Sequence, residues 1–469
     1  MNRLLAVPVV LAGALAISGC NDSSSSSDND SGPVSQVRII HASPDAPPVN
    51  VLVDDEVAVE AADYKQAAVL NPEAGSYQVA VEGIVPGGNV TVIGPVDFTF
   101  EENVRYNVVA VGEVGGIAPV VFEDEPGFSS SDEVRVRIGH LAPNAPNVDI
   151  YVTAAGDGDD LSAVDPLLVD VPFETVAEPV EVIAGDYRIQ VTTVGSADPV
   201  FDSGRVTLPA GADLFVGAVQ NTGANLTDSG ASPVSLMVVN GADVSEIFDV
   251  DQGAGVRAVH NSANAPEVDV LVDDVPTLTG IAFGETAPAA VLDGYAALAG
   301  GDYNVKVTPA GATTPVVLDE DLTLDNGQGY SVLAVGLIDD ADTPIEALVL
   351  EDSVRSIATQ ASLRVVHGST QAGNVNIYLL PEGQDEIGNA EPALADVPYK
   401  AVTDYLPIPE GTYNLRVTDL DGNVAISADN IGLDNGGVYT VIARDGEDGN
   451  GSVLTDFGLI LLDDFITAI

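Results

Sequence analysis

The chain has 469 residues, of which 72 are acidic and 15 are basic, giving a formal net charge of −57 at pH 7. Such a surface repels nucleic-acid phosphates and anionic lipid headgroups, so nucleic-acid binding is excluded. The 46% apolar content is enough for several hydrophobic cores, and 47 glycines and 29 prolines predict many turns, so we expect a globular chain.

Residues 1–20 have the features of a secretory signal. Arg3 precedes an apolar run from residue 4 to 17 that is too short to span a membrane, and small residues follow. The ending Ile17-Ser18-Gly19-Cys20 resembles the lipobox of bacterial lipoproteins, in which the cysteine is lipidated and begins the mature chain. Cys20 is the one cysteine, so no intramolecular disulfide can form. With Asn21 next, the resemblance implies a cell-envelope protein, lipid-anchored in the outer membrane of a Gram-negative bacterium.

Residues 21–35 are rich in Ser, Asp and Asn and show no apolar periodicity. A segment of this composition cannot bury enough surface to fold, so we expect a flexible tether. It would hold the first domain clear of the membrane.

The segment 36–126 predicts a domain of short strands. Alternation places Val37, Ile39 and His41 on one face of the first strand and Arg38 on the other. A second apolar strand and its return strand flank the pair Asp54-Asp55, which predicts a hairpin. Further alternating segments cover residues 75–81, 96–100 and 106–111. About seven short strands without a helical period indicate an antiparallel β-sandwich.

The strand that ends in histidine occurs four times and uses all four histidines of the chain. Each copy also carries an arginine three residues earlier; the pairs are Arg38 and His41, Arg137 and His140, Arg257 and His260, and Arg364 and His367. The histidines lie 99, 120 and 107 residues apart, which is the length of a whole domain. We therefore expect four tandem sandwiches, at residues 36–126, 133–252, 255–355 and 360–469. The linkers are short, which favours an extended row of roughly 150 Å.

A Gly-x-Tyr turn begins a later strand in every copy, with the tyrosines at Tyr77, Tyr187, Tyr303 and Tyr413. This resembles the tyrosine corner of immunoglobulin-like sandwiches, in which the hydroxyl binds the backbone, and it implies a structural role. The late apolar strand starts with tyrosine in three copies, whereas the second copy has Leu214. The fold therefore does not require an aromatic contact at that position.

The histidine strand, the segment Ala-Ser-Pro-Asp-Ala-Pro-x-Val after it, and the Gly-x-Tyr turn together resemble domain of unknown function 4397. The resemblance covers residues 36–469 as four copies and departs in the fourth, where Gly373 replaces the usual proline. It implies secreted or surface-attached bacterial domains, commonly in tandem and often in lipoproteins. It implies no activity and no site residues.

One constellation could carry chemistry: the arginine, the histidine and a polar residue nine positions after the histidine. That residue alternates as Asn50, Asp149, Asp269 and Asn376, so the position supplies an acceptor oxygen and not a required charge. Each copy also has a single histidine and no thiol, so a zinc-type site would need two copies to meet. We therefore predict structural histidines, hydrogen-bonded beneath the Pro-rich turn, with no catalytic residues and no metal ligands.

The acidic composition has two interpretations: solubility in a salty environment, or a set of calcium sites. Oxygen ligands are available in the turns 157–160, 419–423 and 445–450. None of these turns has a complete twelve-residue loop with the closing glutamate, so we expect no cofactor and leave calcium open.

Two functions remain. The first is a monomeric, non-enzymatic surface lipoprotein, whose tandem sandwiches act as a spacer or an adhesive binding array for matrix polysaccharide or an envelope protein. The alternative is a carbohydrate-active or other hydrolytic enzyme with paired acids in one copy. The insertion at residues 156–166 makes the second copy the place to seek such a pair. No Gly-x-Ser-x-Gly or phosphate-binding loop is present.

Overall fold

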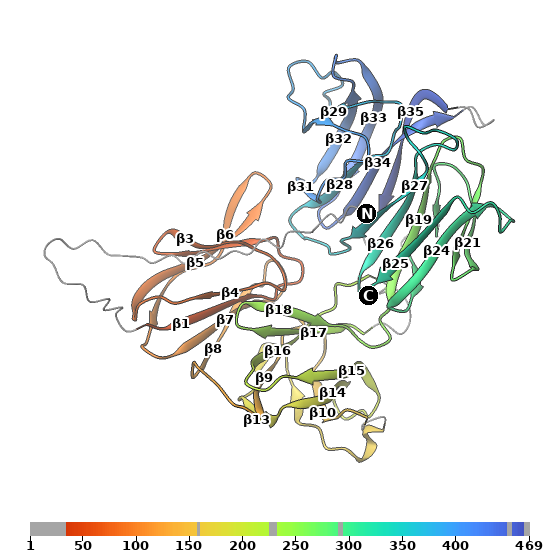
Figure 1. The fold of residues 1–469 in the computed structure, drawn as a ribbon. Coiled ribbons are helices and arrows are strands. Elements are labelled where there is room, and N and C mark those ends of the chain that lie inside the picture. The colour runs from red at the N-terminus through yellow and green to blue at the C-terminus, as the bar shows by residue number, and fades with distance from the viewer. Residues whose placement is uncertain (1–33, 157–159, 225–231, 289–293, 448–452, 464–469) are drawn as a thin grey trace, which may run out of the picture.

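The computed structural model describes residues 34–156, 160–224, 232–288, 294–447 and 453–463. These residues form 35 strands and one short 3-10 turn, η1 (Leu161–Ala163), and include no apolar helix of membrane-spanning length. The strands build eight sheets that pack as four sandwiches in chain order (Figure 1). The prediction of an all-β chain of tandem sandwiches is confirmed. The predicted signal, with Cys20, and almost all of the tether lie outside the described residues.

Sandwich 1 has two four-stranded sheets, with strand orders β4-β1-β7-β8 and β3-β2-β5-β6. Asp54 and Asp55 join β2 to β3 with φ of 50° and 65°, which is the two-residue hairpin turn that matches strand twist. Its strands are β1 (Gln36–His41), β2 (Val49–Val53), β3 (Glu56–Ala62), β4 (Ala67–Leu70), β5 (Gly75–Val85), β6 (Gly88–Phe100), β7 (Arg105–Val111) and β8 (Ala118–Asp124).

Sandwich 2 has the sheets β11-β10-β14-β15 and β12-β9-β16-β17-β18, with β13 also paired to β9. The strand β18 extends the second sheet beyond the position where the equivalent sheet of sandwich 1 ends. Its strands are β9 (Glu133–His140), β10 (Val148–Ala154), β11 (Leu168–Val171), β12 (Thr175–Val176), β13 (Val180–Ile183), β14 (Gly185–Thr193), β15 (Pro199–Leu208), β16 (Asp213–Gln220), β17 (Val234–Asn240) and β18 (Asp243–Ile247).

Sandwiches 3 and 4 repeat the plan. Sandwich 3 has the sheets β22-β19-β26-β27, with β23 beside β19, and β21-β20-β24-β25; sandwich 4 has β31-β28-β34-β35 and β30-β29-β32-β33. The strands of sandwich 3 are β19 (Ala254–Asn261), β20 (Val268–Val272), β21 (Val275–Ile281), β22 (Thr286–Ala287), β23 (Ala296–Leu298), β24 (Gly301–Pro309), β25 (Leu318–Leu324), β26 (Gly329–Val335) and β27 (Glu346–Asp352). Those of sandwich 4 are β28 (Ala361–His367), β29 (Val375–Pro381), β30 (Leu394–Val397), β31 (Leu406–Ile408), β32 (Gly411–Thr418), β33 (Val424–Leu433), β34 (Val438–Glu447) and β35 (Val453–Asp463).

In every sandwich the strand that ends in histidine lies inside its sheet and pairs in parallel with the late apolar strand. The other pairs between named strands are antiparallel. The parallel register is the same in all four copies. The residue directly before the arginine lies opposite Tyr106, Leu214, Tyr330 or Tyr439 on the late apolar strand. Equivalent positions can therefore be compared directly.

The sandwiches pack against one another in two pairs. Ile40 and Val109, on the outer face of a sheet of sandwich 1, pack against Phe215 and Met237 of sandwich 2, and all four are fully buried. The same outer face joins sandwiches 3 and 4, where Val259, Leu333, Val366 and Ile442 are buried together. The histidine strand thus has apolar residues on both faces, because one face fills a sandwich and the other joins two sandwiches.

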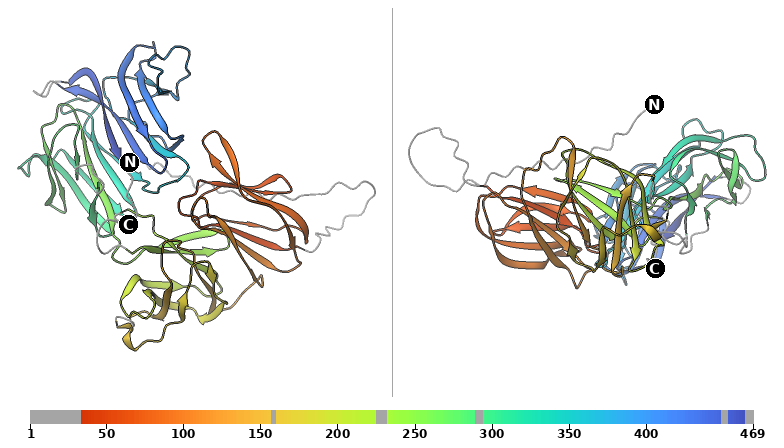
Figure 2. Two further views of the ribbon diagram at one scale, coloured as in Figure 1. Left: turned by 180° about the vertical axis from the view of Figure 1, so that it is seen from behind. Right: turned by 90° about the horizontal axis from the view of Figure 1, so that it is seen from below.

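The expected extended row is wrong. The segment between sandwiches 3 and 4 binds sandwich 1, where the backbone N–H of Ala358 donates to the carbonyl of Asp45. The four sandwiches accordingly follow an arc, and not a line, that brings sandwich 1 to the start of sandwich 4 (Figures 1 and 2). The linkers are short, as expected. The sandwiches do not lie in a row because each has an apolar outer sheet face, and burying that face against a neighbouring sandwich is more favourable than exposing it to water.

Sandwiches 1 and 3 resemble each other, as do sandwiches 2 and 4. In sandwiches 1 and 3 a two-residue turn, Asp54-Asp55 or Asp273-Asp274, joins the first hairpin. In sandwiches 2 and 4 the equivalent strands are joined by the longer segments 155–167 and 382–393. Short and long connections at this position therefore alternate along the chain.

Candidate functional site

The four histidines lie buried at the ends of their strands, each beneath the turn that follows. Nε2 lies 2.7 to 3.2 Å from a backbone carbonyl oxygen six residues later, which belongs to Pro47, Pro146, Pro266 or Gly373. In His41, His260 and His367, Nδ1 accepts from the backbone N–H of a serine two residues on. These contacts fit a neutral ring that carries its proton on Nε2. The histidine thereby fixes the turn to the strand.

An aromatic ring meets each histidine edge-on, with ring centroids 6.1 to 6.4 Å apart. The rings are those of Tyr64, Phe173, Phe283 and Tyr399. The residue after each ring has a positive φ and donates its N–H to the histidine carbonyl. This contact was not predicted from the sequence. The signal was present, since the ring follows the histidine by 23 residues in sandwiches 1 and 3 and by 33 and 32 in sandwiches 2 and 4.

Burial controls the ionisation of these histidines. Burial, together with the nearby Arg355 cation, lowers the pKa of His41 to about 4. Burial also lowers the pKa of His140 and of His367. His41 is therefore neutral at physiological pH, with both ring nitrogens engaged by the backbone.

The polar residue nine positions after the histidine accepts a backbone hydrogen bond in every sandwich. Asn50, Asp149, Asp269 and Asn376 receive the N–H of Ala61, Asp170, Gly280 and Asp396 respectively, at 2.8 to 2.9 Å. Each donor residue has a positive φ of 50° to 68°. The position therefore supplies an oxygen that holds a kink in the neighbouring strand, which asparagine and aspartate can both do.

The four tyrosines of the Gly-x-Tyr turns have the geometry of a tyrosine corner. Each hydroxyl donates to the carbonyl oxygen four residues earlier, at 2.7 to 3.0 Å. The acceptors for Tyr77, Tyr187, Tyr303 and Tyr413 belong to Glu73, Ile183, Ala299 and Pro409. The hydroxyl thus closes its own turn.

The four arginines lie at the interfaces between paired sandwiches. Arg38 donates to Asn107 at 2.7 Å, Asn107 donates to Asp124 at 2.8 Å, and Arg137 of sandwich 2 donates to Asp124 at 2.7 Å. Asp124 is the last residue of β8, so it closes sandwich 1 and binds sandwich 2. Burial lowers the pKa of Arg38 to about 10, so it keeps its charge at neutral pH.

An equivalent chain of hydrogen bonds joins sandwiches 3 and 4. Arg257 donates to Ser331 at 2.7 Å, Ser331 donates to Asp352 at 2.5 Å, and Arg364 of sandwich 4 binds the other oxygen of Asp352. Asp352 is the last residue of β27 and its side chain has no exposed surface. The arginines therefore join sandwiches. Their partners Asp124 and Asp352 were not predicted from the sequence.

The candidate calcium turns serve the local backbone. Asp419 accepts from the backbone N–H groups of Asp421 and Asn423. Asp445 is buried and accepts from Ser369, Thr370 and Gln371 in the turn after His367. Parts of the turns 157–160 and 445–450 lie outside the described residues. Within the described part of the chain, no three His, Cys, Asp or Glu side chains gather as a metal site would require.

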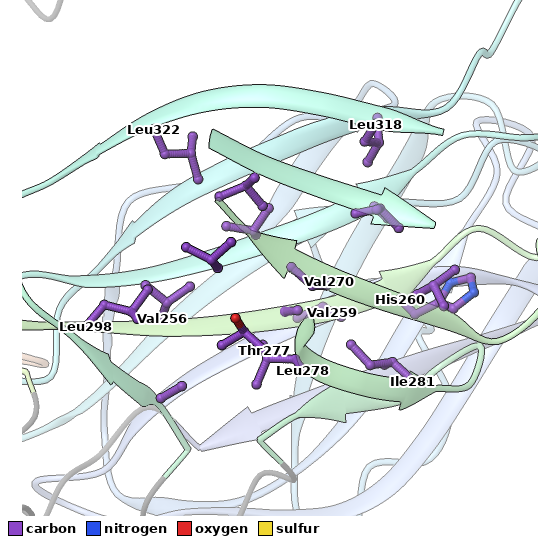
Figure 3. Close-up of a pocket in the computed structure, with 18 of the residues that line it drawn as sticks. Val256, Val259, His260, Val270, Thr277, Leu278, Ile281, Leu298, Leu318 and Leu322 are labelled. Atoms are coloured by element: carbon purple, nitrogen blue, oxygen red, sulfur yellow. The ribbon is translucent and has the colours of Figure 1, made fainter. Parts of the chain in front are cut away.

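An enclosed space of about 40 Å³ lies between the two sheets of sandwich 3. Figure 3 shows its lining side chains, such as Val256, Leu278 and Leu318, turning inward from both sheets. Ala258 lines it at the position where the other sandwiches have Ile39, Ile138 and Val365. Since a smaller side chain accounts for the space, it is a packing defect.

A larger groove, of about 440 Å³, lies in sandwich 2 between β15 and the β17–β18 hairpin. Its base is aliphatic, with Ile189, Leu214 and Val216 nearly buried. Asp243 is the one carboxylate among its lining residues. The insertion near residue 160 is not among the lining residues.

The family model described as "Domain of unknown function (DUF4397)" matches residues 35–151, 254–378 and 382–466, together more than half of the chain. The chain belongs to this family. The DUF4397 matches include all four histidines and their arginines, whereas residues 152–253, most of sandwich 2, lie outside them.

A search of curated proteins finds no match to this chain. Among solved structures, a similar one is the crystal structure of CBMbc (family CBM26) from Eubacterium rectale Amy13K in complex with maltoheptaose. The sequence identity is 8%, the alignment covers 45% of this chain and 96% of that chain, and the TM-score is 0.14. Similarity at this level carries no information about a ligand of this chain.

Proposed function

We propose that this DUF4397 protein is a non-catalytic, lipid-anchored binding protein of the bacterial cell envelope, built from four copies of the family domain. One observation carries the proposal: the polar residues that recur in the copies all have structural partners. The histidines, the Asn/Asp acceptors and the tyrosines bind backbone groups, and the arginines join sandwiches. The recurring polar residues thus maintain the fold, and in this proposal ligands bind at the faces and edges in which the copies differ.

The arc of sandwiches favours a binding body over a spacer. A spacer gains reach from sandwiches in line, whereas here sandwich 1 binds the segment that precedes sandwich 4. Envelope polysaccharide and envelope proteins are the partner classes that an exposed, anchored body would meet. The protein acts as a monomer and without a cofactor in this proposal.

The anchor is tested at Cys20. Palmitate labelling and membrane fractionation of the wild-type protein should show a lipidated protein in the outer membrane. Cys20→Ser should abolish labelling and release the protein into the soluble fraction. Labelling of the serine variant, or a wild-type protein that is soluble without lipid, would contradict the proposed anchor.

Binding is tested with the lipid-free chain from residue 34 onward, immobilised and exposed to glycan panels and to envelope extract. Saturable capture of a single glycan class or envelope protein is expected. Turnover of panel glycans by the same preparation would contradict the non-catalytic proposal, as would capture that the unfolded chain reproduces.

A further inference from the structure

The groove in sandwich 2 is bounded by strands of both sheets. One wall is the end of β15, and the other is the β17–β18 hairpin. Leu214 and Val216, at the base, belong to β16 and are 5% and 3% exposed. Core residues at the edge of a sandwich are normally covered by closely packed side chains. In sandwich 2 a groove of about 440 Å³ lies over Leu214 and Val216 instead.

The other three sandwiches close the equivalent space with a tyrosine. Tyr106, Tyr330 and Tyr439 stand opposite the same position of the histidine strand as Leu214 does. Each hydroxyl accepts from the backbone N–H of the residue five positions earlier, at 3.0, 3.1 and 3.5 Å; the donors are Glu101, Asp325 and Asp434. The tyrosine ring thus covers the edge of the core, and its hydroxyl holds the preceding turn.

Sandwich 2 has lost both ends of this hydrogen bond. Leu214 has no hydroxyl, and the residue five positions earlier is Pro209, which has no N–H. Leu214 and Pro209 both line the groove. Because donor and acceptor are replaced together, the turn is not left with an unsatisfied group from this pair.

Neighbouring positions are smaller as well. In sandwich 1, Phe98 and Phe100 pack against Tyr106 with ring centroids 5.3 and 5.4 Å from it. The strand register places Val206 and Leu208 of sandwich 2 at the positions of Phe98 and Phe100. Relative to sandwich 1, three aromatic rings are therefore replaced by three aliphatic side chains. Sandwiches 3 and 4 have aliphatic residues at the two flanking positions too, but they keep the tyrosine.

The strand β18 supplies the outer wall. It pairs with β17 and contributes Val244, Ser245 and Ile247 to the groove lining. Among the described residues, the equivalent sheets of the other sandwiches end at the strand before this position. Sandwich 2 thus has an additional strand on one side of the groove and lacks the tyrosine of the other sandwiches. It is also the sandwich that lies mostly outside the DUF4397 matches.

We propose that this groove binds a straight aliphatic chain that carries an uncharged or cationic head. The lining contains no aromatic ring, and its half-buried Val206, Val238 and Ile247 offer aliphatic surface that would be removed from water on binding. Hydroxyls of Thr207 and Ser245, the amide of Asn240 and the carboxylate of Asp243 line the same groove at exposed positions, where they can meet a polar head. Asp243 and the net charge of −57 disfavour an anionic head.

The test uses three ten-carbon probes: decyltrimethylammonium and decanoate below their micelle concentrations, and decanol below its solubility limit. Calorimetric titration of the lipid-free chain should show one saturable site for decyltrimethylammonium and for decanol, with decanoate at least tenfold weaker. This expectation does not depend on the proposed envelope location. Absence of saturable binding for both decyltrimethylammonium and decanol, or tightest binding of decanoate, would overturn the proposal.

Two variants connect binding to the groove. Leu214→Phe places a ring where three sandwiches have one, and Ser245→Trp adds a bulky side chain on the exposed strand β18, which leaves the core unchanged. Each should weaken decanol binding at least tenfold. The matched control, Ser427→Trp, makes the same change on the exposed edge strand β33 of sandwich 4 and should bind as the wild type does. Decanol affinity equal to that of the wild type in both Leu214→Phe and Ser245→Trp would overturn the assignment.

Discussion

Arg355, in the segment between sandwiches 3 and 4, forms an ion pair with Asp63 of sandwich 1, with 2.5 Å between Nη1 and Oδ1. The same guanidinium donates to the carbonyl oxygens of Pro44 and Ala46 and lies over the ring of Tyr64. Residues 292 positions apart are thereby joined, and the contact surrounds the turn that His41 supports.

Removal of Arg355 should release sandwich 1 from the segment before sandwich 4. In Arg355→Ala we expect amide exchange of the Ala358 N–H, which donates to Asp45, to accelerate at least tenfold, as measured by hydrogen exchange on the peptide 354–360. Arg205→Ala, at a side chain that is 70% exposed, serves as the control. Unchanged protection in Arg355→Ala would show that the guanidinium does not hold the segment.

Acid should destabilise sandwich 1 through His41. Its pKa is about 4 when folded and about 6.5 when unfolded, so between these values the unfolded chain binds more protons. The contribution is present above pH 6.5 and is lost as the pH falls to 4; it amounts to about 3 kcal/mol in the free energy of unfolding.

The histidine titration is measured directly by NMR, since the chain has four histidine signals and substitution assigns each one. The His41 ring should remain neutral until the pH approaches 4. A His41 midpoint near 6.5 in the folded protein would contradict its buried, backbone-bound position.

Loss of the Asp352 carboxylate should break the pairing of sandwiches 3 and 4. Asp352→Ala leaves Arg257 and Arg364 buried without their shared anion, so we expect a loss of about 3–5 kcal/mol in the free energy of unfolding, measured with urea. Asp97→Ala on the exposed face of β6 should leave the unfolding midpoint unchanged. A loss below about 1 kcal/mol in the free energy of unfolding for Asp352→Ala would show that the buried hydrogen bonds of Asp352 are not needed for the pairing of sandwiches 3 and 4.

Filling the space in sandwich 3 should stabilise it. Ala258→Val adds methyl groups toward a void of about 40 Å³, for which we expect a gain of up to about 1 kcal/mol in thermal or urea unfolding. The reverse change at the equivalent position of sandwich 4, Val365→Ala, should destabilise the chain by about 2 kcal/mol or more. If Ala258→Val destabilised sandwich 3, the void would not be open to an added side chain.

Much of each sandwich was predictable from local pattern. Alternation identified the strand around Val37, the pair Asp54-Asp55 identified a hairpin, and the Gly-x-Tyr turn indicated a corner that Tyr77 forms. These features depend on a few consecutive residues, so the sequence contains them directly.

The packing between sandwiches was not predicted, because its signal lies on the second face of strands already assigned to a core. Ile39 faces the sandwich and Ile40 faces sandwich 2, yet both are apolar neighbours in one strand. The groove shows the same limitation. Leu214 stands out in the sequence because the other copies have tyrosine there. That it lines a groove depends on Pro209, five residues earlier, and on β18, and the sequence pattern alone did not place these three together.

The four sandwiches form one body through paired sheet faces and the Arg355 contact. Small-angle X-ray scattering of the lipid-free chain from residue 34 onward measures whether this body persists in solution. We predict a maximum dimension well short of the roughly 150 Å that four sandwiches in line would reach. A scattering profile with a maximum dimension near 150 Å would contradict the claim.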